Sequence, residues 1–315
     1  MTGTLVADPS ATLVGRRVQV KVPATSANLG PGFDTLGLAL ARYDELEVAV
    51  TQAPGVVVEV HGVGAGEVPL DESHLVVRSI AHAFARAGVP LPGLSLVAHN
   101  TIPHGRGLGS SGAAIVAGVV AAKGLLEGVV EFTADELLEL ATELEGHPDN
   151  VAPALFGGLT IAWVTPEGPR HKKLIVHRGV SPLVLVPAHE MSTALARSLQ
   201  PESVPHEDAV FNVSRSALLI AALIQSPELL FQATEDKLHQ NYRAGAMPET
   251  DQLIRELRAA GHPAVVSGAG PSILVLASDP SERADAIARV EAAADTAWQA
   301  LPLAVDFLGA TVQPA

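Results

Sequence analysis

Cysteine is absent from this chain of 315 residues, and aromatic and basic residues are scarce. Without thiols there are no disulfides, no thiolate metal ligands and no cysteine nucleophile. Aromatic residues make up only 3% of the sequence, so we expect a core built mostly of Ala, Val and Leu. The formal net charge is −14 with no evident basic stripe, which argues against nucleic acid or an anionic membrane surface as a partner.

Long apolar runs are also lacking. The run over residues 217–224 is far shorter than the roughly 18 residues that a membrane-spanning helix needs, so we expect no membrane partner. Residues 1–15 have no charged segment followed by an apolar core, which is typical of a loose leader and not of a signal peptide. We therefore expect a cytoplasmic protein, and its length and 48% hydrophobic content predict a globular chain with two domains or one large one.

What the sequence does contain is a glycine- and serine-rich loop before an apolar helix, Ile102-Pro103-His104-Gly105-Arg106-Gly107-Leu108-Gly109-Ser110-Ser111-Gly112. Glycine allows backbone N–H groups to turn inward, and a helix start adds unpaired N–H groups and the positive end of its dipole. Such a loop is suited to hold an anion, most often a phosphate. The loop matches neither the Walker A sequence nor G-x-G-x-x-G, and a loop that merely starts a tightly packed helix is the alternative.

Two other segments gather polar side chains. Asn28 and Asp34 flank Gly30-Pro31-Gly32, and their side chains either stabilise turns or bind a small polar ligand. A capping box at Thr133 opens a helix that ends near Gly146 and carries Glu143 and Glu145. Either glutamate could serve as a ligand of Mg²⁺, which prefers one or two carboxylates with phosphate oxygens and water, or could belong to a solvated helix end.

Further polar candidates lie after this helix and in the second half of the chain. The turn His147-Pro148-Asp149-Asn150 either caps the helix or faces a ligand. Arg197 follows Ser192-Thr193, and Arg243 follows His239-Gln240-Asn241-Tyr242. Both arginines are surface charges or, because a carboxylate substrate calls for a bidentate guanidinium, parts of a substrate site.

Strands and helices alternate through both halves, which indicates an α+β fold. The patterns predict strands over 16–22, 36–40, 45–51, 56–61, 93–100, 174–177, 183–186, 264–266, 273–277 and 305–309. They predict helices over 73–88, 110–126, 133–146, 192–199, 209–225, 250–260 and 282–298. The charged, turn-like stretch at 166–173 predicts a boundary between domains over 1–166 and 167–315.

Three stretches together resemble the GHMP small-molecule kinases, and their order spans nearly the whole chain. They are Val22 through Asp34, Ile102-Pro103 through Ser111, and Ser267-Gly268-Ala269-Gly270-Pro271-Ser272. Within that superfamily, four motifs are similar to the homoserine kinase family: Asn28 through Asp34, Glu145 through Pro153, Ser192-Thr193 with Arg197, and Asp236 through Gln240 with Tyr242-Arg243.

The resemblance implies a fold, an activity and ligands. The fold would be a two-domain GHMP-kinase fold, with an N-terminal domain like the second domain of ribosomal protein S5 and a smaller ferredoxin-like C-terminal domain. The activity would be transfer of phosphate from ATP, with Mg²⁺, to the hydroxyl of L-homoserine, giving O-phospho-L-homoserine in threonine biosynthesis. The expected partner is the small-molecule substrate L-homoserine, and the formation of a homodimer is left open.

The resemblance also implies roles for individual residues. ATP would be wrapped by the loop residues Pro103, Gly105, Arg106, Gly107, Leu108, Gly109, Ser110, Ser111 and Gly112. Mg²⁺ would be held by Ser110 and Glu145, with Ser111 and Glu143 as alternatives. The substrate and catalytic residues would be Asn28, Asp34, His147, Asn150, Thr193, Arg197, Arg243 and Gly268.

On physical grounds, the two arginines would bind the α-carboxylate of the substrate, Asp34 would bind the α-ammonium group, and Asn28 would lie near the reacting hydroxyl. Some GHMP kinases have an aspartate as base where this chain has Asn150. Because Asn accepts no proton at neutral pH, we expect catalysis by positioning and charge neutralisation. Two alternatives stay open: a kinase or decarboxylase of the mevalonate branch, and a catalytically silent binding protein on this fold.

Overall fold

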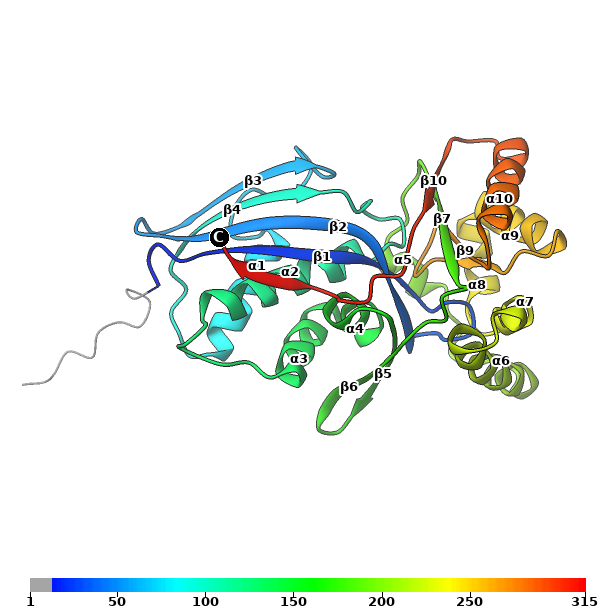
Figure 1. Cartoon of the computed structure of the whole chain (residues 1–315), viewed down its shortest axis with the longest axis horizontal. Coiled ribbons are helices and arrows are strands. Elements are labelled where there is room, and N and C mark those ends of the chain that lie inside the picture. The colour runs from blue at the N-terminus through cyan, green and yellow to red at the C-terminus, as the bar shows by residue number, and fades with distance from the viewer. Residues whose placement is uncertain (1–12) are drawn as a thin grey trace, which may run out of the picture.

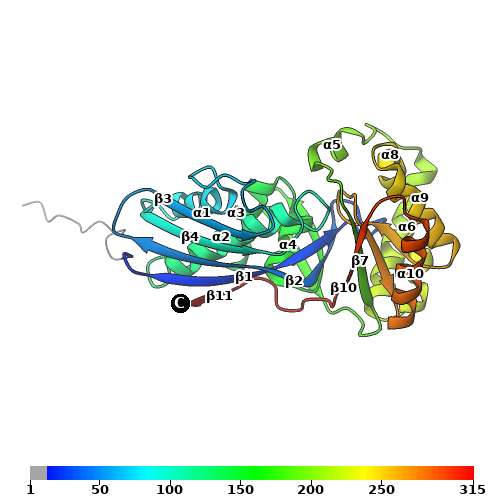
Figure 2. The ribbon, with the colours of Figure 1, turned by 90° about the horizontal axis from the view of Figure 1, so that it is seen from above.

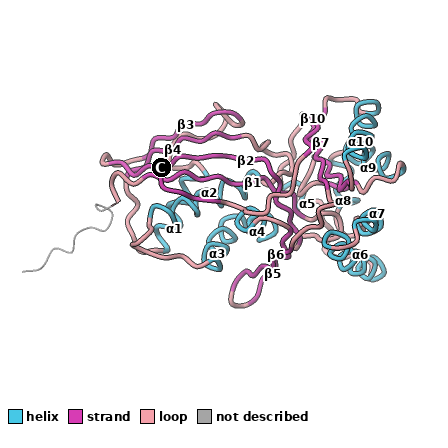
Figure 3. Tube along the Cα trace, in the orientation of Figure 1, coloured by secondary structure: helices cyan, strands magenta, loops and turns pink. Residues whose placement is uncertain are grey.

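The computed structural model describes residues 13–315, which form two halves side by side (Figures 1 and 2). The larger half contains a sheet that has seven strands among these residues, along the path β11-β1-β2-β4-β3 with β5 and β6 continuing from β2. The strands are β1 (Arg17–Ala27), β2 (Leu36–Thr51), β3 (Val56–Gly62), β4 (Gly93–Asn100), β5 (Leu159–Thr165), β6 (Gly168–Leu174) and β11 (Thr311–Pro314). Its helices pack on one face, as Figure 3 shows: α1 (Leu75–Arg86), α2 (Ser110–Leu125), α3 (Ala134–Glu145) and α4 (Pro148–Phe156).

The smaller half is built on an antiparallel sheet in the order β10-β7-β9-β8. Its strands are β7 (Ser181–Pro187), β8 (Ala264–Val266), β9 (Ile273–Ala277) and β10 (Trp298–Pro302). The helices are α5 (Thr193–Ser198), α6 (His206–Ile224), α7 (Leu230–Ala233), α8 (Gln240–Arg243), α9 (Pro248–Ala259) and α10 (Pro280–Ala293), with 3₁₀ turns at Pro227–Leu229 and Ala244–Ala246. The first strand in sequence lies between the last and the third, which is the ferredoxin-like order, and the α+β prediction is confirmed.

Local sequence signals account for the helices that frame the later site. The Thr133 hydroxyl accepts a hydrogen bond from the Glu136 N–H (3.2 Å), and the Glu136 carboxylate accepts one from the Thr133 N–H (2.8 Å). This is the predicted capping box, and α3 ends at Gly146 in the left-handed region (φ 92°). Helix α2 begins directly after Gly109, another left-handed glycine (φ 68°).

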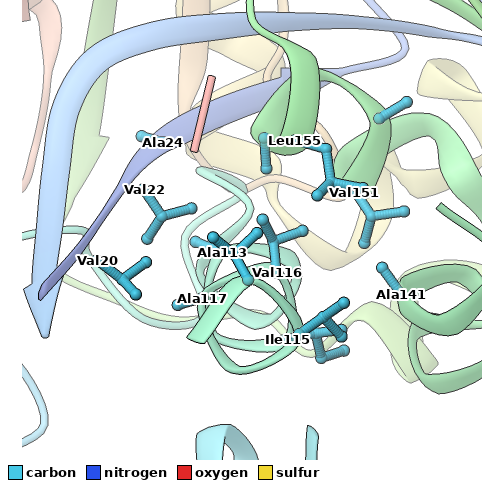
Figure 4. Packing of buried hydrophobic residues seen from close by; sticks show 14 of the residues in the cluster. Val20, Val22, Ala24, Ala113, Ile115, Val116, Ala117, Ala141, Val151 and Leu155 are labelled. Atoms are coloured by element: carbon cyan, nitrogen blue, oxygen red, sulfur yellow. The ribbon is translucent and has the colours of Figure 1, made fainter. Parts of the chain in front are cut away.

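Helix α2 lies at the centre of the core, between the sheet and the other helices (Figure 4). Ala113, Val116 and Ala117 of this helix are fully or almost fully buried, and Val20 and Val22 of β1 belong to the same cluster. Small side chains let the elements approach closely, as expected from a core poor in aromatic residues.

Three predicted segments differ from the structure. The two strands predicted over 36–40 and 45–51 are one continuous strand, β2, because β1 pairs with it along both parts. The charged stretch at 166–173, predicted as a domain boundary, lies in a β-hairpin, since Gly168–Leu174 forms β6 and pairs with β5. Of the strand predicted over 174–177, only Leu174 lies in a strand, as the last residue of β6.

The end of the chain also differs from prediction. The helix predicted over 282–298 ends at Ala293, and Trp298–Pro302 is the edge strand β10. The strand predicted over 305–309 is wrong, because those residues cross back to the larger sheet, where Thr311–Pro314 pairs with β1. We therefore propose that the domains meet near residue 175, with the last strand returning to the first domain.

Two further observations concern the sequence-based expectations. The leader predicted over 1–15 lies mostly outside the described residues, and Leu13 at its end is fully buried. Among residues 13–315 we find no helix that combines the length and apolar character needed to cross a membrane.

Replacing Gly118 by Ala should destabilise the protein, although alanine is the better helix former by about 1 kcal/mol. An added Cβ would lie 2.5 Å from the Val76 carbonyl oxygen and 2.6 Å from the Ser79 Cβ, so α1 and α2 would have to move apart. Gly245→Ala is the matched control, since a Cβ there meets nothing within 4 Å. Thermal melting should show a lower Tm for Gly118→Ala only; an unchanged or higher Tm would contradict the close helix contact.

Candidate active site

A cleft of about 180 Å³ opens where the two halves meet. Most of the residues predicted from the sequence line it: Asn28, Asp34, Gly105, Arg106, Gly107, Gly109, Ser110, Ser111, Glu145, His147, Asn150, Thr193, Arg197, Arg243 and Gly268. The loop residues Pro103, Leu108 and Gly112 do not line it, and Leu108 is a fully buried core residue. Residues with no predicted role, including Asp149, Met191 and Gly270, complete the lining.

The glycine loop is held at both ends. At its start, the buried Asp44 carboxylate accepts hydrogen bonds from the N–H groups of Thr101 (2.6 Å) and Ile102 (2.9 Å). Further along, Gly107 has a φ of 72°, and a Cβ there would collide with the Ser267 carbonyl oxygen. The Ser267 hydroxyl donates to the Gly107 carbonyl oxygen (2.7 Å), so the first and second glycine motifs are in direct contact.

Arg106 ties this loop to the smaller half. Its guanidinium donates to the carbonyl oxygens of Pro187 (3.1 Å) and Ala188 (2.7 Å). The same group bonds the His104 carbonyl oxygen (2.8 Å) and pairs with Glu190 (2.9 Å). The side chain of Arg106 therefore anchors the loop to the smaller half at the edge of the cleft, which it helps to line.

The two candidate metal-binding glutamates lie in different surroundings. The Ser111 hydroxyl donates to the Glu145 carboxylate (2.7 Å) inside the cleft, and burial raises the pKa of Glu145. Glu143 instead bonds His82 (2.7 Å) and Arg86 (2.6 Å) outside the cleft. Slight burial would raise the pKa of Glu143, but these two partners outweigh it and lower the pKa. Only Glu145 of the two lines the cleft.

Glu145 and Ser111 offer hard oxygen donors, which suit Mg²⁺. Among the described residues, 13–315, no three His, Asp or Glu side chains gather into a complete metal site. A metal ion held at Glu145 would therefore take its remaining ligands from phosphate oxygens and water.

The stretch after Glu145 is a helix, α4, and the predicted turn is wrong beyond His147. Pro148 occupies the first helical position, where the missing N–H leaves no bond unmade. His147 Nδ1 bonds the buried Asp149 carboxylate, which raises the pKa of His147 although burial alone would lower it. The Asn150 side-chain oxygen accepts a hydrogen bond from the Thr25 hydroxyl (2.9 Å), so its amide is held at the cleft wall.

The loop between β1 and β2 presents Asn28 and Asp34 in unusual backbone conformations. Both have positive φ (70° and 53°), which for residues other than glycine is often found at functional sites. Asn28 Nδ2 donates to the Gly268 carbonyl oxygen (2.9 Å), and Asn28 Oδ1 accepts from the Asp34 N–H (3.0 Å). Buried His239 donates to the Gly30 carbonyl oxygen (2.7 Å), which fixes this loop from the smaller half.

The two predicted arginines occupy different positions. Arg197 on α5 forms a bidentate pair with Asp34, at 2.8 and 3.1 Å. Arg243 is 2% exposed, donates to the Gly268 carbonyl oxygen (3.2 Å) and lies 5.2 Å from the Phe33 ring centroid. Burial lowers the pKa of Arg243, and its buried Nε has no hydrogen-bond partner among residues 13–315.

A second cavity of about 260 Å³ adjoins the cleft, and Ser110 and Ser111 line both. Its walls are mainly apolar, with His74 and His104 among its polar residues. Sequence reasoning missed this cavity because its walls come from β1, β2, β4, α1 and α2, which only folding brings together. It likewise assigned no role to Thr25, Glu190 or His239; the only signal was that Thr25 and His239 lie within the quoted motifs.

Known proteins share this arrangement. Residues 74–158 match the family described as GHMP kinases N terminal domain, and residues 219–296 match GHMP kinases C terminal. Fold and cleft thus define a small-molecule kinase of the GHMP class.

The particular branch follows from more similar proteins. The homoserine kinase of Leifsonia xyli subsp. xyli is 75% identical over 300 residues, which are 95% of this chain and 93% of that protein. The crystal structure of homoserine kinase from Cytophaga hutchinsonii covers 99% of this chain and 100% of its own, with a TM-score of 0.84 and 27% identity. The chain therefore belongs to the homoserine kinase family of the GHMP kinases.

A member of the rival mevalonate branch shares only the fold. The mevalonate diphosphate decarboxylase from Enterococcus faecalis has a TM-score of 0.67 at 14% identity, and the aligned parts cover 95% of this chain and 99% of its own.

Replacing Arg106 by Gln should loosen the glycine loop. Loss of the bonds to Pro187 and Ala188 should raise the KM for ATP on the order of tenfold, since hydrogen bonds to charged groups are the stronger ones. Amide hydrogen exchange over 104–109 should speed up in parallel. Arg170→Gln on the β6 hairpin is the matched control, and unchanged exchange in Arg106→Gln would contradict the anchoring role.

Proposed function

We propose that the protein transfers the γ-phosphoryl group of ATP to the hydroxyl group of L-homoserine, giving ADP and O-phospho-L-homoserine for threonine biosynthesis. One observation carries the proposal: the glycine loop opens a helix in the same cleft that holds Arg197, Arg243 and Asp34. The loop suits phosphate, while opposite charges a few ångströms apart suit a zwitterionic amino acid. A cytoplasmic location belongs to the same proposal.

ATP would span the two cavities. The nucleoside would occupy the more apolar 260 Å³ cavity, and the phosphates would cross Ser110 and Ser111 into the 180 Å³ cleft. The N–H groups at the start of α2 and its dipole would face the phosphates. The buried Nδ1 of His74 has no hydrogen-bond partner in the described part of the chain, which supports a polar contact to the base.

Glu145, with Ser110 or Ser111, would hold Mg²⁺, which when bound neutralises negative charge on the phosphates. The hydrogen bond from Ser111 to Glu145 favours Ser111 as the partner hydroxyl. The location of Glu143 outside the cleft favours Glu145 as the carboxylate.

Catalysis would rest on positioning. Asn150 cannot accept a proton, so Asn28 and Asn150 would orient the substrate hydroxyl and not deprotonate it. The loose transition state of phosphoryl transfer demands little proton abstraction, which makes a strong base unnecessary. Arg197 and Arg243 would bind the α-carboxylate and hold the hydroxyl in place for in-line attack.

The test of this function is ADP release with Mg·ATP against L-homoserine, L-serine, L-threonine and mevalonate. Turnover with homoserine and not with the other three is the expected result. Turnover with mevalonate would keep the phosphate loop and discard the roles of the two arginines. No turnover with any of the four, in a folded protein, would favour a binding protein on this fold.

Replacing Glu145 by Gln should lower kcat on the order of a hundredfold and raise the Mg²⁺ concentration needed for half-maximal rate, because the carboxylate charge that would hold Mg²⁺ at the phosphates is lost. Glu143→Gln is the matched control on the same helix and should keep wild-type kinetics. Initial rates over a Mg²⁺ titration measure both effects. If Glu143→Gln showed the larger loss, the metal assignment would be wrong.

A further inference from the structure

Asp34 and Arg197 form an ion pair across the cleft. Asp34 belongs to the loop between β1 and β2 in the larger half, and Arg197 belongs to α5 in the smaller half. Two hydrogen bonds of 2.8 and 3.1 Å join the carboxylate to the guanidinium at the cleft. Their side chains are 37% and 39% exposed, so a small ligand can reach both charges.

The neighbouring charges are arranged differently. Asp149 is paired with His147, and Glu145 accepts a hydrogen bond from Ser111. Arg243 forms no ion pair with a carboxylate among residues 13–315 and bonds only the Gly268 carbonyl oxygen. The cleft therefore holds one balanced, exchangeable pair beside one buried cation.

We propose that the Asp34–Arg197 pair is a charge filter that admits zwitterions by exchange of partners. The proposal rests on the proposed function, because it takes an α-amino acid as the ligand. The ligand ammonium group pairs with the Asp34 carboxylate, and the ligand carboxylate pairs with the Arg197 guanidinium, so two new ion pairs replace the one between Asp34 and Arg197. Each charge that leaves its partner gains another, so the exchange leaves no charge unpaired.

A ligand with only one of the two charges meets a penalty. A hydroxy acid without an ammonium group must displace Asp34 from Arg197 and leaves that carboxylate unpaired in the cleft. An amino alcohol without a carboxylate leaves Arg197 unpaired in the same way, beside a second cation, Arg243. Breaking an ion pair by taking one partner away costs more than never having formed it.

The backbone around Asp34 fits this role. Its N–H is bonded to the Asn28 side chain, which in turn is bonded to Gly268, so the position of the carboxylate is held by both halves. Arg197 reaches the carboxylate from a short helix capped by Ser192, whose hydroxyl accepts from the Leu195 N–H (3.1 Å). The exchange therefore needs only a change in the long arginine side chain, with the Asp34 loop unchanged.

Ligands that differ by one charged group test the filter. 4-Hydroxybutyrate is homoserine without its ammonium group, and 3-amino-1-propanol is homoserine without its carboxylate. Titration calorimetry with the full chain gives the Kd of each, independently of turnover. Wild type should bind L-homoserine more tightly than either analogue.

The discriminating variant is Asp34→Asn. It should weaken homoserine binding and at the same time tighten 4-hydroxybutyrate binding, each by about tenfold, because Arg197 no longer has a carboxylate to give up. A residue that only touched the substrate ammonium would weaken homoserine and leave 4-hydroxybutyrate unchanged. That second pattern would overturn the filter.

Arg197→Gln is the reciprocal variant, and it keeps the test decisive if Asp34→Asn does not fold. It should weaken homoserine binding and tighten 3-amino-1-propanol binding. Asp208→Asn is the matched control: it breaks a similar pair with Lys237 (2.8 Å) that does not line the cleft, and it should change neither Kd.

The outcomes separate this proposal from the proposed function. Selective homoserine turnover by wild type with no tightening of either analogue in the variants would keep the function and overturn the filter. Homoserine binding with the predicted tightening but no turnover would keep the filter and overturn the kinase activity. Absence of homoserine binding to the folded wild-type chain would overturn both.

Discussion

The contact between the glycine loop and the second glycine turn is the constraint on which the site depends. Gly107 approaches the backbone of Ser267 so closely that no Cβ fits between them, and the Ser267 hydroxyl bonds the Gly107 carbonyl oxygen. This contact joins the phosphate loop of the larger half to the smaller half. The cleft exists because the backbones meet there, and both glycine motifs are needed for the same reason.

Charge compensation is the second organising feature. Four ionisable groups of the cleft form two pairs, His147 with Asp149 and Arg197 with Asp34. Two others form no ion pair among the described residues: Arg243, which is buried against Phe33 and the Gly268 carbonyl oxygen, and Glu145, which is bonded to the Ser111 hydroxyl. A cleft with this distribution attracts an anionic group, and it favours ligands that restore each pair they disturb.

The fold shows how far local patterns reach. Capping at Thr133, the apolar run of α2 and the short strands β8 and β9 were predicted from the sequence, because each depends on neighbouring residues. The hairpin strand β6 and the returning strand β11 were not predicted. Strand β6 is polar and pairs with β5 in an exposed hairpin. Strand β11 is short and pairs with β1, which lies at the other end of the sequence.

At the site, the sequence by itself determined which residue types gather in the motifs and the class of chemistry they suit. It could not decide between Glu143 and Glu145, since helical spacing only puts them on different faces, and packing of α3 decides which face meets the cleft. It could not show that Arg106 bonds the segment after β7, because that bond spans more than eighty residues and two sheets. Only the tertiary structure decided that Asp34 and Arg197 are partners, since their contact requires the two halves to close on one another.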